Sequence, residues 1–141
     1  MRSDVVHVNA FLDWCLGDRD LARGKLLQAI ELNPESFWSF YNLGVMALKD
    51  EEYKIAMQFF YQASQIPPQR SMAVISNSKI YNQITSLSKE VSVDRKENLK
   101  DGYDKLRIIL PLINWVMDNP QDSKRVAEVK RLADSLYPKI F

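Results

Sequence analysis

Several residue types are scarce in this chain, and each scarcity excludes a class of protein. Only four glycines occur in 141 residues and no alternating strand pattern recurs, so the sequence predicts an all-α fold. The single cysteine, Cys15, cannot form an internal disulfide, which suits a reducing compartment such as the cytoplasm. With one histidine, His7, and no paired cysteines, there is no metal-ligand pattern, and we expect neither a metal nor a cofactor.

An excess of charge of one sign is also lacking. Nineteen basic residues stand against eighteen acidic ones, so the net charge of +1 provides no field that would attract a nucleic acid or an anionic membrane. The longest apolar run, residues 108–113, contains Pro111 and falls far short of the roughly 20 residues that a membrane helix needs. We therefore expect no nucleic-acid partner and no direct insertion into a membrane.

Groups that could carry catalysis are not gathered by any motif. The sequence has no phosphate-binding glycine loop and no nucleophile elbow, and His7 has no partners at a useful spacing. The acidic run at residues 50–52 is explained by a turn before a helix, where the helix dipole favours carboxylates. We expect His7 to be an ordinary surface or interface residue, and the protein not to be an enzyme.

What the chain does have is an internal repeat. When the sequence is shifted against itself so that Asp18 falls on Glu52, one segment matches another at positions of the same character. The matched positions are Asp18, Leu21, Ala22, Leu26, Gln28, Ala29 and Pro34 in the first copy, and Glu52, Ile55, Ala56, Phe60, Gln62, Ala63 and Pro68 in the second. A period of about 34 residues is typical of stacked helix pairs, none of which can bury its apolar face alone.

The second copy shows the two helices of such a pair. Apolar residues recur at helical intervals first through Phe40, Leu43, Gly44 and Ala47 and then, after a polar turn, through Tyr53, Ala56, Phe60 and Ala63. Gly44 and Ala56 are small where the helices should cross, and Phe40 and Phe60 are large enough to fill the space beside them.

This stretch, FYNLGVMALKDEEYKIAMQFFYQASQIPP, resembles the tetratricopeptide repeat in its Leu-Gly pair, its Tyr, Ala, aromatic and Ala positions and its closing Pro. The resemblance implies a right-handed α-solenoid of about three helix pairs with a C-terminal capping helix, all in one domain. The expected repeats span residues 3–34, 37–68 and 71–118, with an insertion near 86–101 and a capping helix over 120–137. Asn119 is the expected N-cap of that last helix, with Pro120 at its first position.

In such stacks the first helix of each pair lines a concave groove. Transferred to this sequence, the resemblance predicts an apolar groove that binds a protein partner, with the following lining residues: Trp38, Tyr41, Asn42, Val45, Leu48, Met72, Ile75, Lys79, His7 and Phe11. Large exposed apolar surfaces usually mark binding sites. The alternative is that another part of the chain fills the groove, which would make Trp38 and Tyr41 part of the core.

The leading hypothesis is therefore a non-enzymatic scaffold that holds a helix or an apolar peptide of another protein in this groove. A second hypothesis is self-association into a homo-oligomer through Leu112, Trp115 and Val116 or through the last helix. A third is that the chain is the docking part of a larger protein, and that protein could be attached to a membrane. The sequence does not identify the partner, because a fold does not imply a function.

Overall fold

The computed structural model describes residues 2–71 and 95–136, except for the side chains of residue 4 and residues 95–97, and every regular element in these ranges is a helix. The helices with defined bounds are α1 (Ser3–Cys15), α2 (Arg19–Leu32), α3 (Phe37–Lys49), α4 (Tyr53–Gln65), α7 (Arg95–Asp118) and α8 (Ser123–Ser135). A further helix begins at residue 68 and is described as far as residue 71. The predicted all-α fold class is confirmed.

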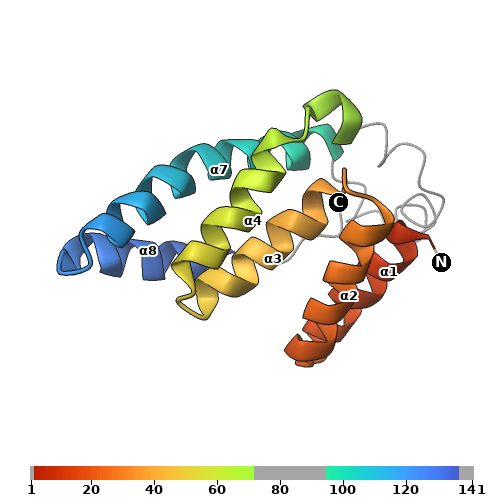
Figure 1. Cartoon of the computed structure of the whole chain (residues 1–141), viewed down its shortest axis with the longest axis horizontal. Coiled ribbons are helices and arrows are strands. Elements are labelled where there is room, and N and C mark those ends of the chain that lie inside the picture. Colours follow the sequence, from red (N-terminus) through yellow and green to blue (C-terminus); the bar gives the residue numbers. More distant parts are fainter. Residues whose placement is uncertain (1, 72–94, 137–141) are drawn as a thin grey trace.

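The helices are arranged as packed pairs (Figure 1). α1 packs along α2 and α3 along α4, and each pair is joined by a short turn. The first pair meets the second where α2 lies against α3. On the other side α7 runs along α4, and α8 turns back from the end of α7 to contact α3.

The repeat found in the sequence is also present in the helix boundaries. The shift that places Asp18 on Glu52 also places both ends of α1 on those of α3 and the start of α2 on the start of α4. The buried positions follow the same offset, since Ala22, Leu26 and Ala29 of α2 correspond to Ala56, Phe60 and Ala63 of α4. The sequence alignment thus identified residues with the same structural role.

Both turns inside these pairs close in the same way. After α1, the Gly17 and Asp18 N–H groups donate to the carbonyls of Trp14 and Asp13, and Gly17 has a φ of 85°. After α3, the Glu51 and Glu52 N–H groups donate to the carbonyls of Leu48 and Ala47, and Glu51 has a φ of 59°. This is the Schellman pattern, in which a left-handed residue satisfies the last helical carbonyls.

Close contact between α3 and α4 depends on Gly44. A Cβ atom at this position would lie 2.5 Å from two ring atoms of Phe60, which is itself fully buried. The predicted crossing point, with a small residue facing a large one, is confirmed.

The C-terminal helices depart from the expected boundaries. α7 begins at Arg95, inside the predicted insertion, and it continues without interruption through Pro111. The expected N-cap at Asn119 is wrong: α8 begins at Ser123, and the Asp122 side chain accepts the Arg125 N–H at 3.2 Å. Asp122 is the N-cap because its side-chain oxygen accepts an N–H group of the first turn of α8. The Asn119 side chain instead donates to the Trp115 carbonyl at the end of α7.

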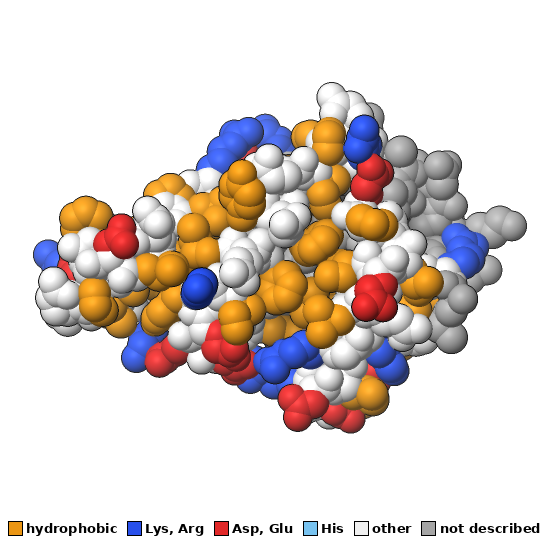
Figure 2. Space-filling model, viewed as in Figure 1, with side chains coloured by type: hydrophobic (Ala, Val, Ile, Leu, Met, Phe, Trp, Pro, Cys, Tyr) orange, Lys and Arg blue, Asp and Glu red, His pale blue; other side chains and the backbone are white. Residues whose placement is uncertain are grey.

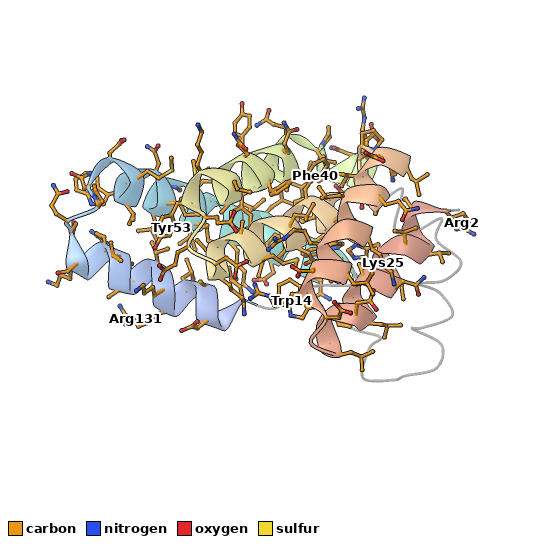
Figure 3. All side chains as sticks on the ribbon, turned by 60° about the horizontal axis from the view of Figure 1, so that its bottom comes forward. Arg2, Trp14, Lys25, Phe40, Tyr53 and Arg131 are labelled. Carbon is orange, nitrogen blue, oxygen red and sulfur yellow. The ribbon has the colours of Figure 1, made fainter. Side chains whose placement is uncertain are left out.

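The outer side of α8 is charged. Val129 and Leu136 are buried against the core, while Lys130 and Arg131 are exposed. Arg131 extends away from the other helices in Figure 3. Within the described ranges no helix is both long enough and apolar enough to cross a bilayer.

Candidate interaction surface

The predicted concave groove is not open in this structure. Trp38, Tyr41, Val45 and Leu48 are between 0% and 4% exposed, and Asn42 is 1% exposed. Trp38, Tyr41, Val45 and Leu48 belong to the main hydrophobic cluster of the molecule. The prediction that these residues line a partner groove is therefore wrong, and the alternative, that the chain covers them itself, agrees with the structure. Met72, Ile75 and Lys79 lie outside the described residues.

α7 is the helix that covers α3. The ring of Tyr103 stacks on that of Phe37, with their centroids 4.4 Å apart. Next to it, a Cβ atom at Gly102 would lie 2.8 Å from the Trp38 ring, so only glycine lets α7 approach this closely. The Tyr103 hydroxyl donates to the Ile66 carbonyl and lies 3.0 Å from the Ser71 hydroxyl, which ties α7 to the chain just after α4.

Burial also changes the chemistry of the two tyrosines in this region. Burial raises the pKa of Tyr41 well above its ordinary value, and the nearby Asp101 carboxylate raises it further. Burial raises the pKa of Tyr103 as well, partly opposed by its hydrogen bond with Ser71. Burial favours the neutral phenol at both positions, so neither side chain acts as an acid. Tyr103 serves as a hydrogen-bonding group.

His7, which we expected to be an ordinary surface or interface residue and to line the groove, is buried between helices of the protein itself. It is 1% exposed, and its Nδ1 lies 2.9 Å from the Ser39 hydroxyl, which also accepts a hydrogen bond from Ser36 at 2.7 Å. The contact joins α1 to α3 and holds the first pair against the second. Phe11, the other groove residue predicted on α1, is partly exposed.

An apolar groove lies on the opposite side of α3, between α2 and α4. Its walls are Leu27 from α2 and Ile55 and Phe59 from α4, and its floor is Leu43 and Ala47 from α3. Arg23 and Glu52 stand at one end. We call this feature, defined by these seven residues, the outer groove.

The size of the outer groove suits side chains rather than a small molecule. Its volume is about 210 Å³, below the roughly 300–1,000 Å³ of typical small-molecule pockets. Leu27 and Ile55 are each 41% exposed, so their apolar atoms are accessible from solvent. The groove has room for one or two side chains of a partner.

The exposed part of α4 is poor in charge. α4 contains one charged residue, Lys54, and its exposed or partly exposed residues include Met57, Phe59, Tyr61 and several glutamines. Figure 2 shows hydrophobic side chains gathered over this side of the molecule, with most charged side chains toward its edges. Interface cores are enriched in aromatic residues and methionine and poor in charge, so this composition is typical of a protein interface.

Charges beside the groove are largely paired. Arg23 lies 2.9 Å and Arg19 3.1 Å from the two carboxylate oxygens of Asp50, which links α2 to the turn between α3 and α4. Glu51 pairs with Lys130 of α8 at 3.1 Å. These exposed pairs contribute little to stability.

The second predicted surface is broken up by folding. Val116 is 2% exposed and Leu112 is partly buried, while the half-exposed Trp115 donates its indole N–H to Asp122 at 3.0 Å. Leu112, Trp115 and Val116 therefore do not form one apolar stripe on the surface.

Sequence reasoning missed the outer groove, although a signal was present. Leu27 and Ile55 interrupt otherwise polar outer faces, and α4 has almost no charge where a solvated helix would carry several. Comparisons of the chain with protein-family models, with curated proteins and with solved structures find no match in any of the three. The likeness to tetratricopeptide repeats therefore rests on the residues and on the spacing of the repeat alone.

Proposed function

We propose that this protein is a non-enzymatic protein–protein interaction module, built as a right-handed stack of tetratricopeptide-like helix pairs, that holds a helix of another protein in the outer groove. The observation that carries the proposal is the exposed apolar surface formed by Leu27 of α2 with Ile55 and Phe59 of α4, a helix that contains a single charged residue. Contiguous apolar surface costs solubility, and on soluble proteins it usually marks a binding site.

A helix is the occupant that fits the geometry. The groove lies between two helices over a third, and the side chains of a fourth helix pack into such a furrow as ridges into grooves. Helices that bind in this way anchor themselves by apolar residues spaced three, four or seven positions apart. The groove volume of about 210 Å³ accommodates one such anchor with its neighbours along the rim.

An Ile55→Asp variant tests the proposal. The carboxylate would lose hydration in the occupied groove, so we expect the affinity for the partner to fall by at least about tenfold. Because Ile55 is 41% exposed, the fold should be retained, which circular dichroism and thermal unfolding would check. Binding is measured by titration with the partner recovered on the wild-type chain.

Leu16→Asp is the matched control, because Leu16 is 84% exposed in the turn after α1 and does not line the groove. Its affinity should equal that of the wild type. Equal binding by the Ile55→Asp variant, or loss of binding in the Leu16→Asp control alone, would contradict the outer groove as the docking site.

Self-association is the weaker alternative. The apolar surface expected to carry self-association includes Val116, which is buried. The last helix, α8, presents a charged face to solvent. Light scattering over a concentration series addresses this alternative directly, since a monomer at high micromolar concentration would exclude it.

A further inference from the structure

A second exposed apolar surface lies on α7. Ile108 is 59% exposed and Trp115 is 50% exposed, and Pro111 between them is exposed as well. Leu112, which is partly buried, borders these residues. We call Ile108, Pro111, Leu112 and Trp115 the α7 stripe. It differs from the self-association surface expected from the sequence, because it contains Ile108 and Pro111 and does not contain the buried Val116.

Helical spacing places the α7 stripe on one side of the helix. At about 100° per residue, Trp115 is turned about 20° from Ile108, and the two stripe residues between them lie within about 60° of Ile108, one on each side. The residues that α7 buries lie at least about 100° away from Ile108; they include Leu106, Ile109 and Ile113. The stripe is thus an apolar face on the side of α7 turned away from the core.

The residues of the α7 stripe are arranged symmetrically about its centre. Ile108 and Trp115 are equally far from the point between Pro111 and Leu112. If two copies of α7 run antiparallel around a two-fold axis at this point, Ile108 of one copy lies opposite Trp115 of the other. Pro111 then lies opposite Leu112. Every apolar residue of the stripe meets an apolar residue of the second copy, as an isologous interface requires.

Charges beside the stripe fit the same arrangement. The Arg107 side chain is 80% exposed and makes a single ion pair, at 3.4 Å with Asp104 of its own helix. Asp118 is exposed and has no ion pair in the part of the chain that the structure describes. Arg107 and Asp118 lie within about 20° of each other around α7, so a two-fold pair brings them to the same edge, about 3 Å apart along the axis. Because a guanidinium has five N–H donors, Arg107 can keep Asp104 and also bind Asp118 of the second copy.

We infer that a second copy of this chain covers the α7 stripe, in an antiparallel pair of α7 helices that forms a homodimer. The inference does not depend on the outer groove, whose lining residues belong to α2, α3, α4 and the turn before α4. The stripe is only about 10 Å long, so the contact is smaller than the roughly 1,600 Å² of a standard interface. The dimer is therefore weak and forms at high micromolar concentration.

Cysteine cross-linking of the full chain, on a Cys15→Ser background, tests this arrangement. At the two-fold axis residue 111 lies next to its own copy, so diamide should oxidise a Pro111→Cys chain to a disulfide-linked dimer. Ile108→Cys is the matched control, because it lies about 10 Å along the axis from its own copy, beyond the reach of a disulfide. When this chain is mixed with a Trp115→Cys chain, a mixed disulfide should form.

Light scattering over a concentration series provides a second measurement. The wild type should form dimers at high micromolar concentration, and an Ile108→Glu variant should remain a monomer, because the interface would remove water from its carboxylate. Met117→Glu is the control, since Met117 is 41% exposed and lies about 180° around α7 from Ile108. This variant should dimerise like the wild type.

The outcomes separate the dimer from the docking site. Self cross-linking of the Ile108→Cys chain, or a wild type that stays monomeric at high micromolar concentration, would overturn the inference. Loss of the dimer in the Ile55→Asp variant would also overturn it, because the second copy would then occupy the outer groove. An Ile55→Asp variant that dimerises and binds the partner as the wild type does would overturn the docking site alone.

Discussion

At the scale of single residues, the absence of a side chain decides how closely helices approach. Gly44 and Gly102 are the two places where an added Cβ would collide with an aromatic ring, of Phe60 and Trp38 respectively. The other two glycines, Gly17 and Gly24, have open space at that position. Glycine therefore has a packing role in α3 and α7 and none in α2.

Gly44→Ala should lower the free energy of unfolding. Overpacking a core typically costs about 1–3 kcal/mol, and the fully buried Phe60 ring cannot swing away. This cost exceeds the gain of about 1 kcal/mol that alanine brings to a helix interior. Urea denaturation at constant m-value measures the change.

Gly24→Ala is the control, since nothing lies within 4 Å of the added Cβ. It should raise the free energy of unfolding by up to about 1 kcal/mol. A stabilised Gly44→Ala variant would mean that α3 and α4 do not pack as described.

At the scale of helices, the turns that follow α1 and α3 are one motif with two different residues. Gly17 adopts its left-handed conformation freely, whereas Glu51 adopts it at the cost of contact between its Cβ and the backbone. The internal alignment of the sequence places these two residues opposite each other. The strain at Glu51 is held by the two hydrogen bonds that close α3.

Exchanging the residues should therefore have opposite effects. Glu51→Gly should stabilise the protein by about 1 kcal/mol, because the lost pair with Lys130 is exposed and worth little. Gly17→Glu should destabilise it by about 1–2 kcal/mol. Thermal unfolding of both variants provides the measurement, and a shift of the same sign in both would show that the turns differ.

The start of α8 gives a prediction that depends on pH. The pKa of Asp122 is lowered by the hydrogen bond from Trp115, then by the backbone N–H of Arg125. A lowered pKa means that the carboxylate stabilises the fold above its ordinary pKa near 3.8, and that this contribution is lost as the pH falls below that value. Asp122→Ala should lower the melting temperature by a few degrees at pH 7, and the difference should shrink below pH 4.

Asp134→Ala is the comparison for Asp122, because Asp134 lies near the other end of α8. It removes one carboxylate without removing a cap, so its melting temperature should stay near that of the wild type. A difference between wild type and Asp122→Ala that persists unchanged at low pH would contradict the cap.

At the scale of the whole molecule, α7 covers the face of α3 that carries Trp38 and Tyr41. It brings Gly102 and Tyr103 onto Phe37 and Trp38, and its buried residues Leu106, Ile109 and Ile113 join the same cluster as α3 and α4. The face of α3 that carries Trp38 and Tyr41 is therefore covered. Accessible apolar surface remains in the outer groove between α2 and α4.

Tyr103→Phe tests how α7 is attached. The variant keeps the stacked ring and removes the hydroxyl that donates to the Ile66 carbonyl, at a cost of about 1 kcal/mol. Relative to the wild type, amide hydrogen exchange should become faster in α7, while the exchange rates of α1 and α2 should change less. Tyr61→Phe is the control, since Tyr61 is 56% exposed and should leave both stability and exchange unchanged.

Local pattern was enough to predict the all-α fold, the bounds of the repeated helices α1 to α4 to within a few residues, the period of the repeat and the crossing at Gly44. These features depend on residues close in sequence, and the burial of Ala22, Leu26 and Ala29 and of their counterparts in α4 follows from helical spacing. The start of α8 was misplaced by a few residues because Asn119 and Asp122 both have capping side chains and only the fold selects between them.

Tertiary structure decided what covers the face of α3 that carries Trp38 and Tyr41. Trp38 and Tyr41 have the same amphipathic pattern whether they meet a partner or a helix of their own chain, and α7 lies far from them in the sequence. Burial of apolar area favours both occupants equally, but a tethered helix pays no entropy of association, so α7 is the one that fills the site. The sequence alone thus determined a helical protein with repeated pairs, and the long-range packing of α7 determined which of its apolar faces is covered and which stays exposed.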